Sequence, residues 1–246
     1  MDGQVALVTG GGGGIGSAIA RRLAQAGARV VITYNSNAEK AQRALDSLDG
    51  DGHWAVQASV TDSERMKWLA GEVGGRFGRI DLIVNNAGIT SPVPHDDLDG
   101  LSDDWIDRIF ATNWRGAFAT IRAFNSLLQE GDGGTVVNLS SVAGQTGVGS
   151  NVAYCASKAA MDSMTRSLAR ALAPKVRVLS VSPGWVLGEY AKRFDEAYLA
   201  EQAGKTPLNR LAMPEDVAEA VWAAHMALTY TTGVIVPVDG GRPLGV

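Results

Sequence analysis

Residues 5–24 read Val5-Ala-Leu-Val-Thr-Gly-Gly-Gly-Gly-Gly-Ile-Gly-Ser-Ala-Ile-Ala-Arg-Arg-Leu-Ala24, and this stretch decides the fold. The apolar run Val5–Val8 predicts a buried strand, and the residues from Ile15 onward have the pattern of an amphipathic helix. Glycines between them permit a tight turn whose backbone N–H groups can approach a pyrophosphate at the helix N-terminus. A glycine run is also typical of a flexible linker, but a linker is not bracketed by a strand and a helix. The stretch therefore predicts a nucleotide-binding turn.

Short apolar runs alternate with longer helical patterns along the whole chain. The predicted strands are Val5–Val8, Arg29–Thr33, Trp54–Gln57, Ile80–Val84, Thr135–Leu139, Val176–Val181 and Val234–Val238. The predicted helices cover about 15–26, 37–48, 62–76, 102–128, 152–173 and 214–228. Several strands are nearly continuous in apolar residues, as parallel strands covered on both faces are. We therefore predict an α/β fold of the Rossmann type, with a doubly wound, seven-stranded parallel sheet and helices on both faces.

No linker or internal repeat divides residues 1–246, so we predict a single nucleotide-binding domain. Two segments, 88–101 and 184–213, fit neither a strand nor a short connection. The second follows a strand at the side of the sheet where ligands bind in such folds. We therefore expect residues 184–213 to form a substrate lid.

Composition narrows the possible partners and compartment. The 246 residues carry a formal net charge of -4, which argues against nucleic acid or an anionic membrane as partner. The single cysteine, Cys155, allows no intrachain disulfide and favours a reducing compartment. The start of the chain lacks the pattern of a signal peptide, no stretch is apolar enough for a membrane span, and the three histidines are too scattered to bind a metal. We therefore expect a cytoplasmic protein without a metal site.

Tyr154 and Lys158 lie four residues apart in a predicted helix, and Ser141 lies thirteen residues upstream of the tyrosine. The helical spacing puts the phenol and the ammonium on one face. An ammonium beside a phenol favours the phenolate, so such a tyrosine can exchange a proton with a reacting oxygen. The same spacing also occurs by chance on many helices. The rest of the sequence therefore decides whether this pair indicates proton transfer.

Several motifs stand in the order and spacing of one enzyme family. The first is Thr9-Gly10 followed by Gly14 and Gly16. The others, in chain order, are Asn85-Asn-Ala-Gly88, Asn113, Ser141, Tyr154 with Lys158, Pro183-Gly184 and the run Thr232–Gly241. Together they resemble the short-chain dehydrogenase/reductases over the whole chain. The resemblance is specific for family and cofactor class and not for substrate.

The resemblance implies hydride transfer between a nicotinamide and a carbonyl or alcohol carbon. Tyr154 would supply the proton that the product oxygen needs, and the Ser141 hydroxyl would hydrogen-bond the same oxygen. Lys158 would favour the phenolate and hold the nicotinamide ribose, while Asn113 would anchor a water that links Lys158 to solvent. Cys155 has no indicated base beside it, so we assign it to packing.

The resemblance also assigns residues to the cofactor, and it implies that Asn85, Ala87 and Gly88 line its adenosine side and steady the central sheet. The cofactor-binding residues are predicted to be Gly10, Gly12, Gly13, Gly14, Ile15, Gly16, Tyr34, Asn35, Ser36, Ser59, Val60, Asn86, Ala87, Gly88, Tyr154, Lys158, Pro183, Gly184 and Val186.

Departures from the family pattern bear on cofactor choice. Tyr34 stands where NAD-preferring members usually carry an aspartate, and Asn35, Ser36 and Asn37 could donate hydrogen bonds to a 2'-phosphate. These residues favour NADP(H) over NAD(H), although Gly13 stands where many NADP-users place a cation. Two other departures put family contacts in doubt. They are Ser59, in place of an aspartate at the adenine, and Gly188, in place of a threonine at the carboxamide.

The substrate is less well defined. Residues 207–217 are most similar to 3-oxoacyl-acyl-carrier-protein reductases, but acidic residues in 129–134 speak against a carrier protein. A 3-oxoacyl or other carbonyl reductase is therefore the leading hypothesis. A sugar or polyol dehydrogenase is the alternative, and a catalytically silent nucleotide-sensing domain is a third. The lid aromatics suit an apolar substrate or simple lid packing; they are Trp185, Tyr190, Phe194 and Tyr198.

Small residues on the helix of Tyr154 bear on assembly. They allow close approach of another helix, which by resemblance belongs to a second subunit, so we expect a homotetramer or homodimer. These residues are Ala153, Ala156, Ser157, Ala159 and Ala160.

Overall fold

The computed structural model describes residues 1–188 and 191–242. Its seven strands form one parallel sheet in the order β3-β2-β1-β4-β5-β6-β7. The strands are β1 (Val5–Val8), β2 (Arg29–Tyr34), β3 (Trp54–Gln57), β4 (Leu82–Asn85), β5 (Gly134–Leu139), β6 (Val176–Pro183) and β7 (Ile235–Val238). The predicted doubly wound Rossmann-type fold is confirmed.

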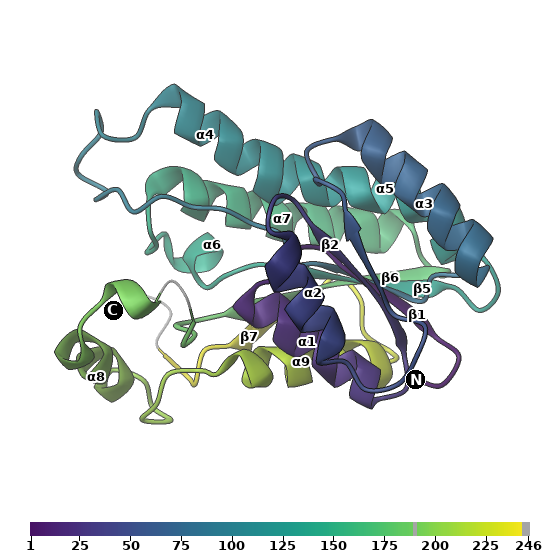
Figure 1. Ribbon diagram of the computed structural model, residues 1–246. Coiled ribbons are helices and arrows are strands. Elements are labelled where there is room, and N and C mark those ends of the chain that lie inside the picture. The colour runs from purple at the N-terminus through teal and green to yellow at the C-terminus, as the bar shows by residue number, and fades with distance from the viewer. Residues whose placement is uncertain (189–190, 243–246) are drawn as a thin grey trace.

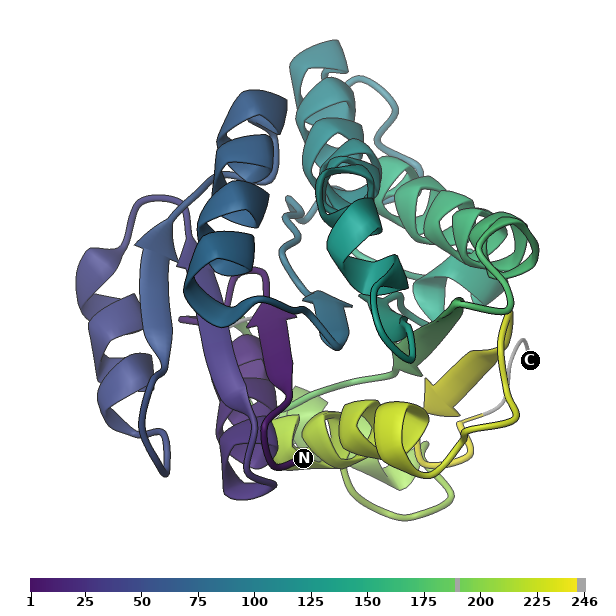
Figure 2. The ribbon, with the colours of Figure 1, turned by 90° about the vertical axis from the view of Figure 1, so that its right-hand side faces the viewer.

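Helices cover both faces of the sheet (Figures 1 and 2). One face is packed by α1 (Gly14–Gln25), α2 (Ala38–Asp46) and α9 (Pro214–Met226). The other is packed by α3 (Ser63–Phe77), α5 (Gly116–Gln129) and α7 (Val152–Ala171). The central strands are fully buried because both faces are covered, which explains why β1 reads as an unbroken apolar run.

The sequence patterns located the long elements to within a few residues. The helix predicted over 102–128 is divided into α4 (Asp103–Phe110), a π-helical turn η1 (Ala111–Arg115) and α5. Three short elements were not predicted: α6 (Ala143–Thr146), the 3₁₀ turn η2 (Ala191–Arg193) and α8 (Glu196–Gly204). The segment 184–213 is therefore partly helical, and Tyr190 lies outside the described residues.

The parallel arrangement brings the carboxyl ends of all strands to one edge of the sheet. The turn after β1, the segment after β4, the segment after β5 and the segment after β6 meet there. In open α/β sheets, the crevice outside these strand ends is where ligands bind. The order of the sheet reverses between β1 and β4, and the glycine turn lies at that position.

Candidate active site

The glycine turn is built for close backbone approach. Gly10 has φ of 67°, which an L side chain rarely adopts. A Cβ on Gly16 would lie 2.5 Å from the Gly10 carbonyl oxygen, so only glycine allows this packing of turn on helix. Gly13 begins α1 without a side-chain cap. The first N–H groups of α1 are therefore available to an anion, as a dinucleotide pyrophosphate requires.

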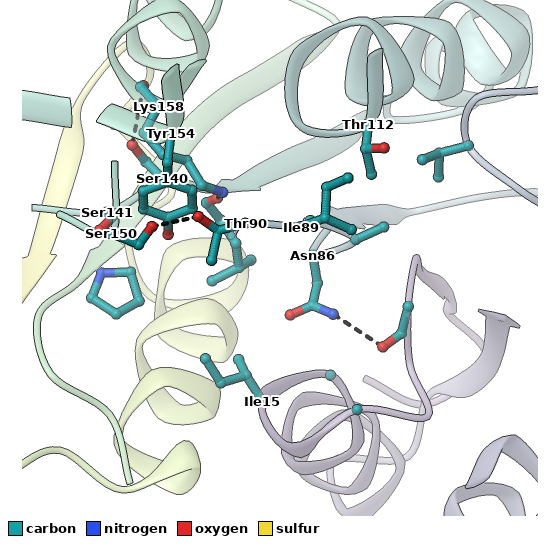
Figure 3. Close-up of a pocket in the computed structure, with 18 of the residues that line it drawn as sticks. Ile15, Asn86, Ile89, Thr90, Thr112, Ser140, Ser141, Ser150, Tyr154 and Lys158 are labelled. Atoms are coloured by element: carbon teal, nitrogen blue, oxygen red, sulfur yellow. Dashed lines mark hydrogen bonds between the residues drawn. The ribbon is translucent and has the colours of Figure 1, made fainter. Parts of the chain in front are cut away.

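Hydrogen bonds to the residues that follow β4 hold this turn in place. The Asn86 amide donates to the carbonyls of Thr9 at 2.9 Å and Gly10 at 3.1 Å (Figure 3). The Thr9 hydroxyl accepts from the N–H groups of Asn86 and Ala87, each at 3.1 Å. Asn85 is buried and donates to Asn138 at 2.8 Å, so it supports the sheet and does not reach the cavity.

A cavity of about 980 Å³ opens at the strand ends. Most predicted site residues line it: Gly10, Gly13, Gly14, Ile15, Gly16, Tyr34, Asn35, Ser59, Val60, Asn86, Ala87, Gly88, Ser141, Tyr154, Lys158, Pro183, Gly184 and Val186. Gly12, Ser36 and Asn113 are not among the lining residues. Gly12 packs against Lys40 and Ala41 at the start of α2, and Ser36 is exposed.

Tyr154 and Ser141 face the same part of the cavity. Figure 3 shows their side chains together on one side, with Ile15 and Asn86 across from them. Asn151 caps α7 by accepting from the Tyr154 N–H at 2.7 Å, which fixes the first turn of the helix. Ser141 Oγ accepts from the N–H of Ala143 at 3.2 Å. The two hydroxyls can therefore converge on one oxygen atom of a ligand.

Lys158 lies beneath Tyr154 in an almost water-free position. Lys158 is only 5% exposed, and its Nζ lies 5.7 Å from the centroid of the Tyr154 ring. The ammonium donates to the Leu139 carbonyl at 2.6 Å. Burial lowers the pKa of Lys158 to about 8, while the nearby Asp162 carboxylate opposes the shift. The ammonium can therefore exchange its proton close to neutral pH.

Asn113 lies behind the cavity, in the π-helical turn η1. Its Oδ1 accepts from the Ile89 N–H at 2.8 Å, and its Nδ2 donates to the Ile89 carbonyl and to Ser157 Oγ, each at 3.1 Å. The side chain thus ties the segment after β4 to α7. A π-helical turn inside a longer helix is frequent at functional sites. Ser157 forms this internal hydrogen bond and is buried, and Ala153 is buried as well. Neither side chain is therefore exposed for contact with a second subunit.

Sequence reasoning missed several lining residues. Arg108, Thr112 and Arg115 come from one face of the helical stretch after 102, and their spacing of three and four residues was a usable signal. Thr90 and Ser150, whose hydroxyls are hydrogen-bonded to each other, line the cavity from two loops that only the fold brings together. Among the described residues that line the cavity, none is Asp or Glu, and three carry a positive charge: Arg108, Arg115 and Lys158.

The described aromatics of the predicted lid pack on one another. Phe194 stacks on Tyr198 at 4.8 Å between ring centroids, and both meet the edge or face of Trp185. Of these three, only Trp185 lines the cavity. Gly188 also lines it, with open space where a side chain would begin. The lid-packing interpretation therefore accounts for Phe194 and Tyr198.

Cys155 follows Tyr154 on α7. It is buried, and burial raises the pKa of its thiol, so the reactive thiolate is disfavoured. This environment fits a packing role.

Known proteins match the chain over nearly its full length. A family model described as enoyl-(acyl carrier protein) reductase matches residues 10–242. The granaticin polyketide synthase putative ketoacyl reductase 2 of Streptomyces violaceoruber is 38% identical over 98% of this chain and 96% of its own. This chain belongs to the short-chain dehydrogenase/reductase family. It is therefore an oxidoreductase of the class that acts on CH–OH and C=O groups.

Other members of the short-chain dehydrogenase/reductase family act on different substrates. The D-threitol dehydrogenase of Mycolicibacterium smegmatis is 35% identical over 98% of this chain and 93% of its own. The crystal structure of a glucose/ribitol dehydrogenase from Brucella melitensis superposes with a TM-score of 0.92 at 31% identity, covering 99% of this chain and 98% of that one. Membership of the family thus defines the fold and the reaction class more closely than the substrate.

Two further observations concern the described residues only. No helix among residues 1–188 and 191–242 has the length and apolar character that crossing a membrane requires. Within the same ranges, no three His, Cys, Asp or Glu side chains gather as a metal site would need.

Proposed function

We propose that this protein transfers hydride between a nicotinamide dinucleotide and a carbonyl or alcohol substrate, with Tyr154 as the general acid and base. The observation that carries the proposal is the buried Lys158 ammonium beneath Tyr154, at one end of a cavity whose other end is the glycine turn. Burying an ammonium costs free energy of folding, and buried charged groups of this kind are concentrated at functional sites.

The cofactor, when bound, would supply or accept the hydride. Its pyrophosphate would be held by Gly13, Gly14 and the N-terminus of α1, where no side chain occupies the first N–H groups. Tyr154 would pass its proton to the carbonyl oxygen, and the Ser141 hydroxyl would donate a hydrogen bond to that oxygen as negative charge develops. The charged Lys158 favours the phenolate that Tyr154 becomes. Asn113 would hold the segment after β4 in register with α7.

NADP(H) is the proposed cofactor form. The lining contains no carboxylate among the described residues, so nothing there repels a 2'-phosphate, and Tyr34 and Asn35 reach the cavity at the end of β2. The Oδ1 of Asn37 caps α2 by accepting from the Lys40 N–H at 2.8 Å, and this bond does not use the Nδ2 donors that a 2'-phosphate would need. Introducing a carboxylate with Tyr34→Asp should shift preference toward NADH, and fluorescence titration with both cofactors measures this.

A 3-oxoacyl or related carbonyl reductase is the proposed activity, in line with the ketoacyl reductase of Streptomyces violaceoruber. A polyol or sugar dehydrogenase is the second candidate, favoured by the similarity to D-threitol dehydrogenase. A silent nucleotide-sensing role is disfavoured because the Tyr154, Lys158 and Ser141 side chains all reach one cavity.

We also propose assembly through α7. Val152 is half exposed, and Ala156 and Ala159 are exposed beside a shallow pocket. A second copy of α7 would cover this face in a homodimer or homotetramer.

The test is a substrate screen with NADPH and NADH over ketones, acyl thioesters and polyols. We expect NADPH oxidation that depends on an added carbonyl compound, and its loss by about 10²-fold or more in Tyr154→Phe. Tyr230→Phe is a matched control because Tyr230 is fully exposed, far from the lining residues. Undiminished turnover in Tyr154→Phe would refute the proposed mechanism, and cofactor binding without any turnover by the wild type would favour the sensing role.

A further inference from the structure

The face of α7 that packs on the sheet remains polar in the two turns that follow Lys158. Lys158, Asp162 and Thr165 are spaced by four and three residues, so they lie on one side of the helix. They are 5%, 3% and 0% exposed, respectively. Two of these three residues can carry a charge, and both are enclosed by protein.

The strands beneath α7 carry polar residues at the same level. Asn138 donates to Thr165 Oγ1 at 2.8 Å, and Thr165 is hydrogen-bonded to Ser180 at 2.8 Å. Ser140, the next residue of this face, is buried and donates to the Lys158 carbonyl at 3.4 Å. Nearer the amino ends of the strands, the same face is apolar and belongs to the hydrophobic core. The polar patch is thus confined to the strand ends at the cavity.

Asp162 lies in this patch without hydrogen bonds of normal geometry. Both carboxylate oxygens are inaccessible and neither forms a hydrogen bond that meets strict geometric criteria, although the Ser140 and Ser180 hydroxyls lie within reach of the carboxylate. The hydroxyls of Ser140 and Ser180 lie near enough to oppose the rise in the pKa of Asp162 that burial causes. A buried carboxylate with so little support costs stability, and a well-packed apolar residue would do better there. Its presence therefore calls for an explanation other than stability.

Asp162 is the charged neighbour that acts on Lys158. It raises the pKa of Lys158 against the effect of burial, and no other charged residue of the described part of the chain has a resolved effect there. The groups facing Lys158 from β5 are the Leu139 carbonyl and Ser140, which are neutral. Arg166, a turn beyond Asp162, acts on Asp162 itself.

The charges on the other elements packed against α7 are directed elsewhere. In η1, Arg115 donates to the Thr61 carbonyl at 3.5 Å. In α4, Arg108 pairs with Asp104 at the surface, at 3.6 Å. In β6, Arg177 bonds to carbonyls at the opposite end of the sheet. Within residues 1–188 and 191–242, Asp162 is therefore the carboxylate that acts as a counter-charge for Lys158.

We propose that Asp162 is a positioning residue that keeps Lys158 protonated from behind while Tyr154 exchanges its proton with substrate in front. The inference rests on the proposed function of Tyr154 and Lys158. A carboxylate on the residue one helical turn after Lys158, enclosed with it, stabilises the charge of the ammonium. A neutral side chain at that position would let Lys158 lose its proton at lower pH. Carbonyl reduction needs the proton on both Tyr154 and Lys158, so it would then decline at lower pH.

The test compares Asp162→Asn with the wild type, using the pH dependence of kcat/KM for NADPH-dependent carbonyl reduction. We expect the alkaline decline to move toward acid by about half a pH unit or more, and by less in Asp162→Glu. Glu64→Gln, which removes an exposed carboxylate paired with Lys67, should leave the profile unchanged. A fall in kcat without movement of the profile would show a structural role only and would overturn the proposal.

A second readout separates this inference from the proposed function. An NMR titration of ¹³C-labelled lysine, assigned with Lys158→Met, follows Lys158 directly. Its midpoint should fall in Asp162→Asn, and an unchanged midpoint overturns the inference whether or not a substrate is found. A wild type without turnover on any carbonyl overturns the proposed function instead. If Asp162→Asn does not fold, Ser180→Ala should move the midpoint the same way by a smaller amount, because it removes a hydroxyl that favours the charged carboxylate.

Discussion

Two buried bases lie at opposite ends of the β5–β6 pair, and burial has different consequences for each. His225 lies at the amino ends of these strands and Lys158 at the carboxyl ends. Burial lowers the pKa of His225 to about 4 and that of Lys158 to about 8. The physical cause is the same, since a low-dielectric interior disfavours charge. The histidine is thereby fixed as neutral, whereas the lysine is brought near the pH at which enzymes work.

The polar groups near the two bases differ in how completely they are hydrogen-bonded. His225 Nε2 donates to the Gln4 side-chain oxygen at 3.1 Å, which leaves Nδ1 to accept from the Thr135 hydroxyl at 3.0 Å. Arg177 donates to Thr135 and to the His225 carbonyl, at 2.9 and 2.7 Å. At the carboxyl ends of the strands, by contrast, Asp162 and Ser182 have buried oxygens without a hydrogen bond that meets strict geometric criteria. A satisfied network stabilises the fold, and an incompletely satisfied one marks the functional end.

The largest expected difference is in activity. Lys158→Met should lower kcat by about 10²- to 10⁴-fold, because it removes the charge that favours the Tyr154 phenolate. Steady-state rates with the best substrate of the screen measure this. Lys67→Met, which removes an exposed ammonium, should retain nearly wild-type rates. Equal losses in the two variants would contradict the distinction between the buried lysine and the surface one.

The second prediction concerns acid stability at the other end. Because the pKa of His225 is lower in the folded chain than its ordinary 6.5, its contribution is complete above pH 6.5 and is lost as the pH falls toward 4. The loss should be roughly 3 kcal/mol of unfolding free energy over that interval. Urea denaturation of wild type and His225→Gln at several pH values measures it. The variant should show a shallower decline, and parallel curves would refute the assignment.

The smallest effects are expected when one hydroxyl is removed at each end of the β5–β6 pair. Thr135→Val should destabilise the fold by about 1–3 kcal/mol, because it leaves His225 and Arg177 short of a partner. Ser182→Ala removes a buried hydroxyl that has no partner, so the unfolding free energy should change by less than about 0.5 kcal/mol or increase slightly. Urea midpoints of both variants test the contrast, which fails if the serine variant is the less stable one.

The sequence predicted the fold well, and it predicted that Ser141, Tyr154 and Lys158 lie together at one cavity, because both predictions depend on local patterns. Alternating apolar runs define the sheet, and the spacing of Tyr154 and Lys158 is fixed by the helix that carries them. The sequence could not reveal that Thr90 and Ser150 meet, since they are sixty residues apart and only the strand order joins them. Gly12, predicted to bind the cofactor, lies against α2 and not among the lining residues, and a glycine run does not say which member faces the cavity and which faces α2.

Asp162 was missed for a different reason. On a helix, an Asp four residues after a Lys normally indicates an exposed ion pair. Only the packing of α7 on β5 and β6 shows that both residues are enclosed. The burial of both residues depends on the whole fold and has no local signature in the sequence.

The most direct test of this account is the titration of Lys158 itself in the folded wild type. An NMR titration of ¹³C-labelled lysine, with the signal assigned by its absence in Lys158→Met, should show one lysine with a midpoint near pH 8. If every lysine, Lys158 included, titrates above about pH 10, then Lys158 is not tuned by burial and the proposed proton-transfer centre is wrong.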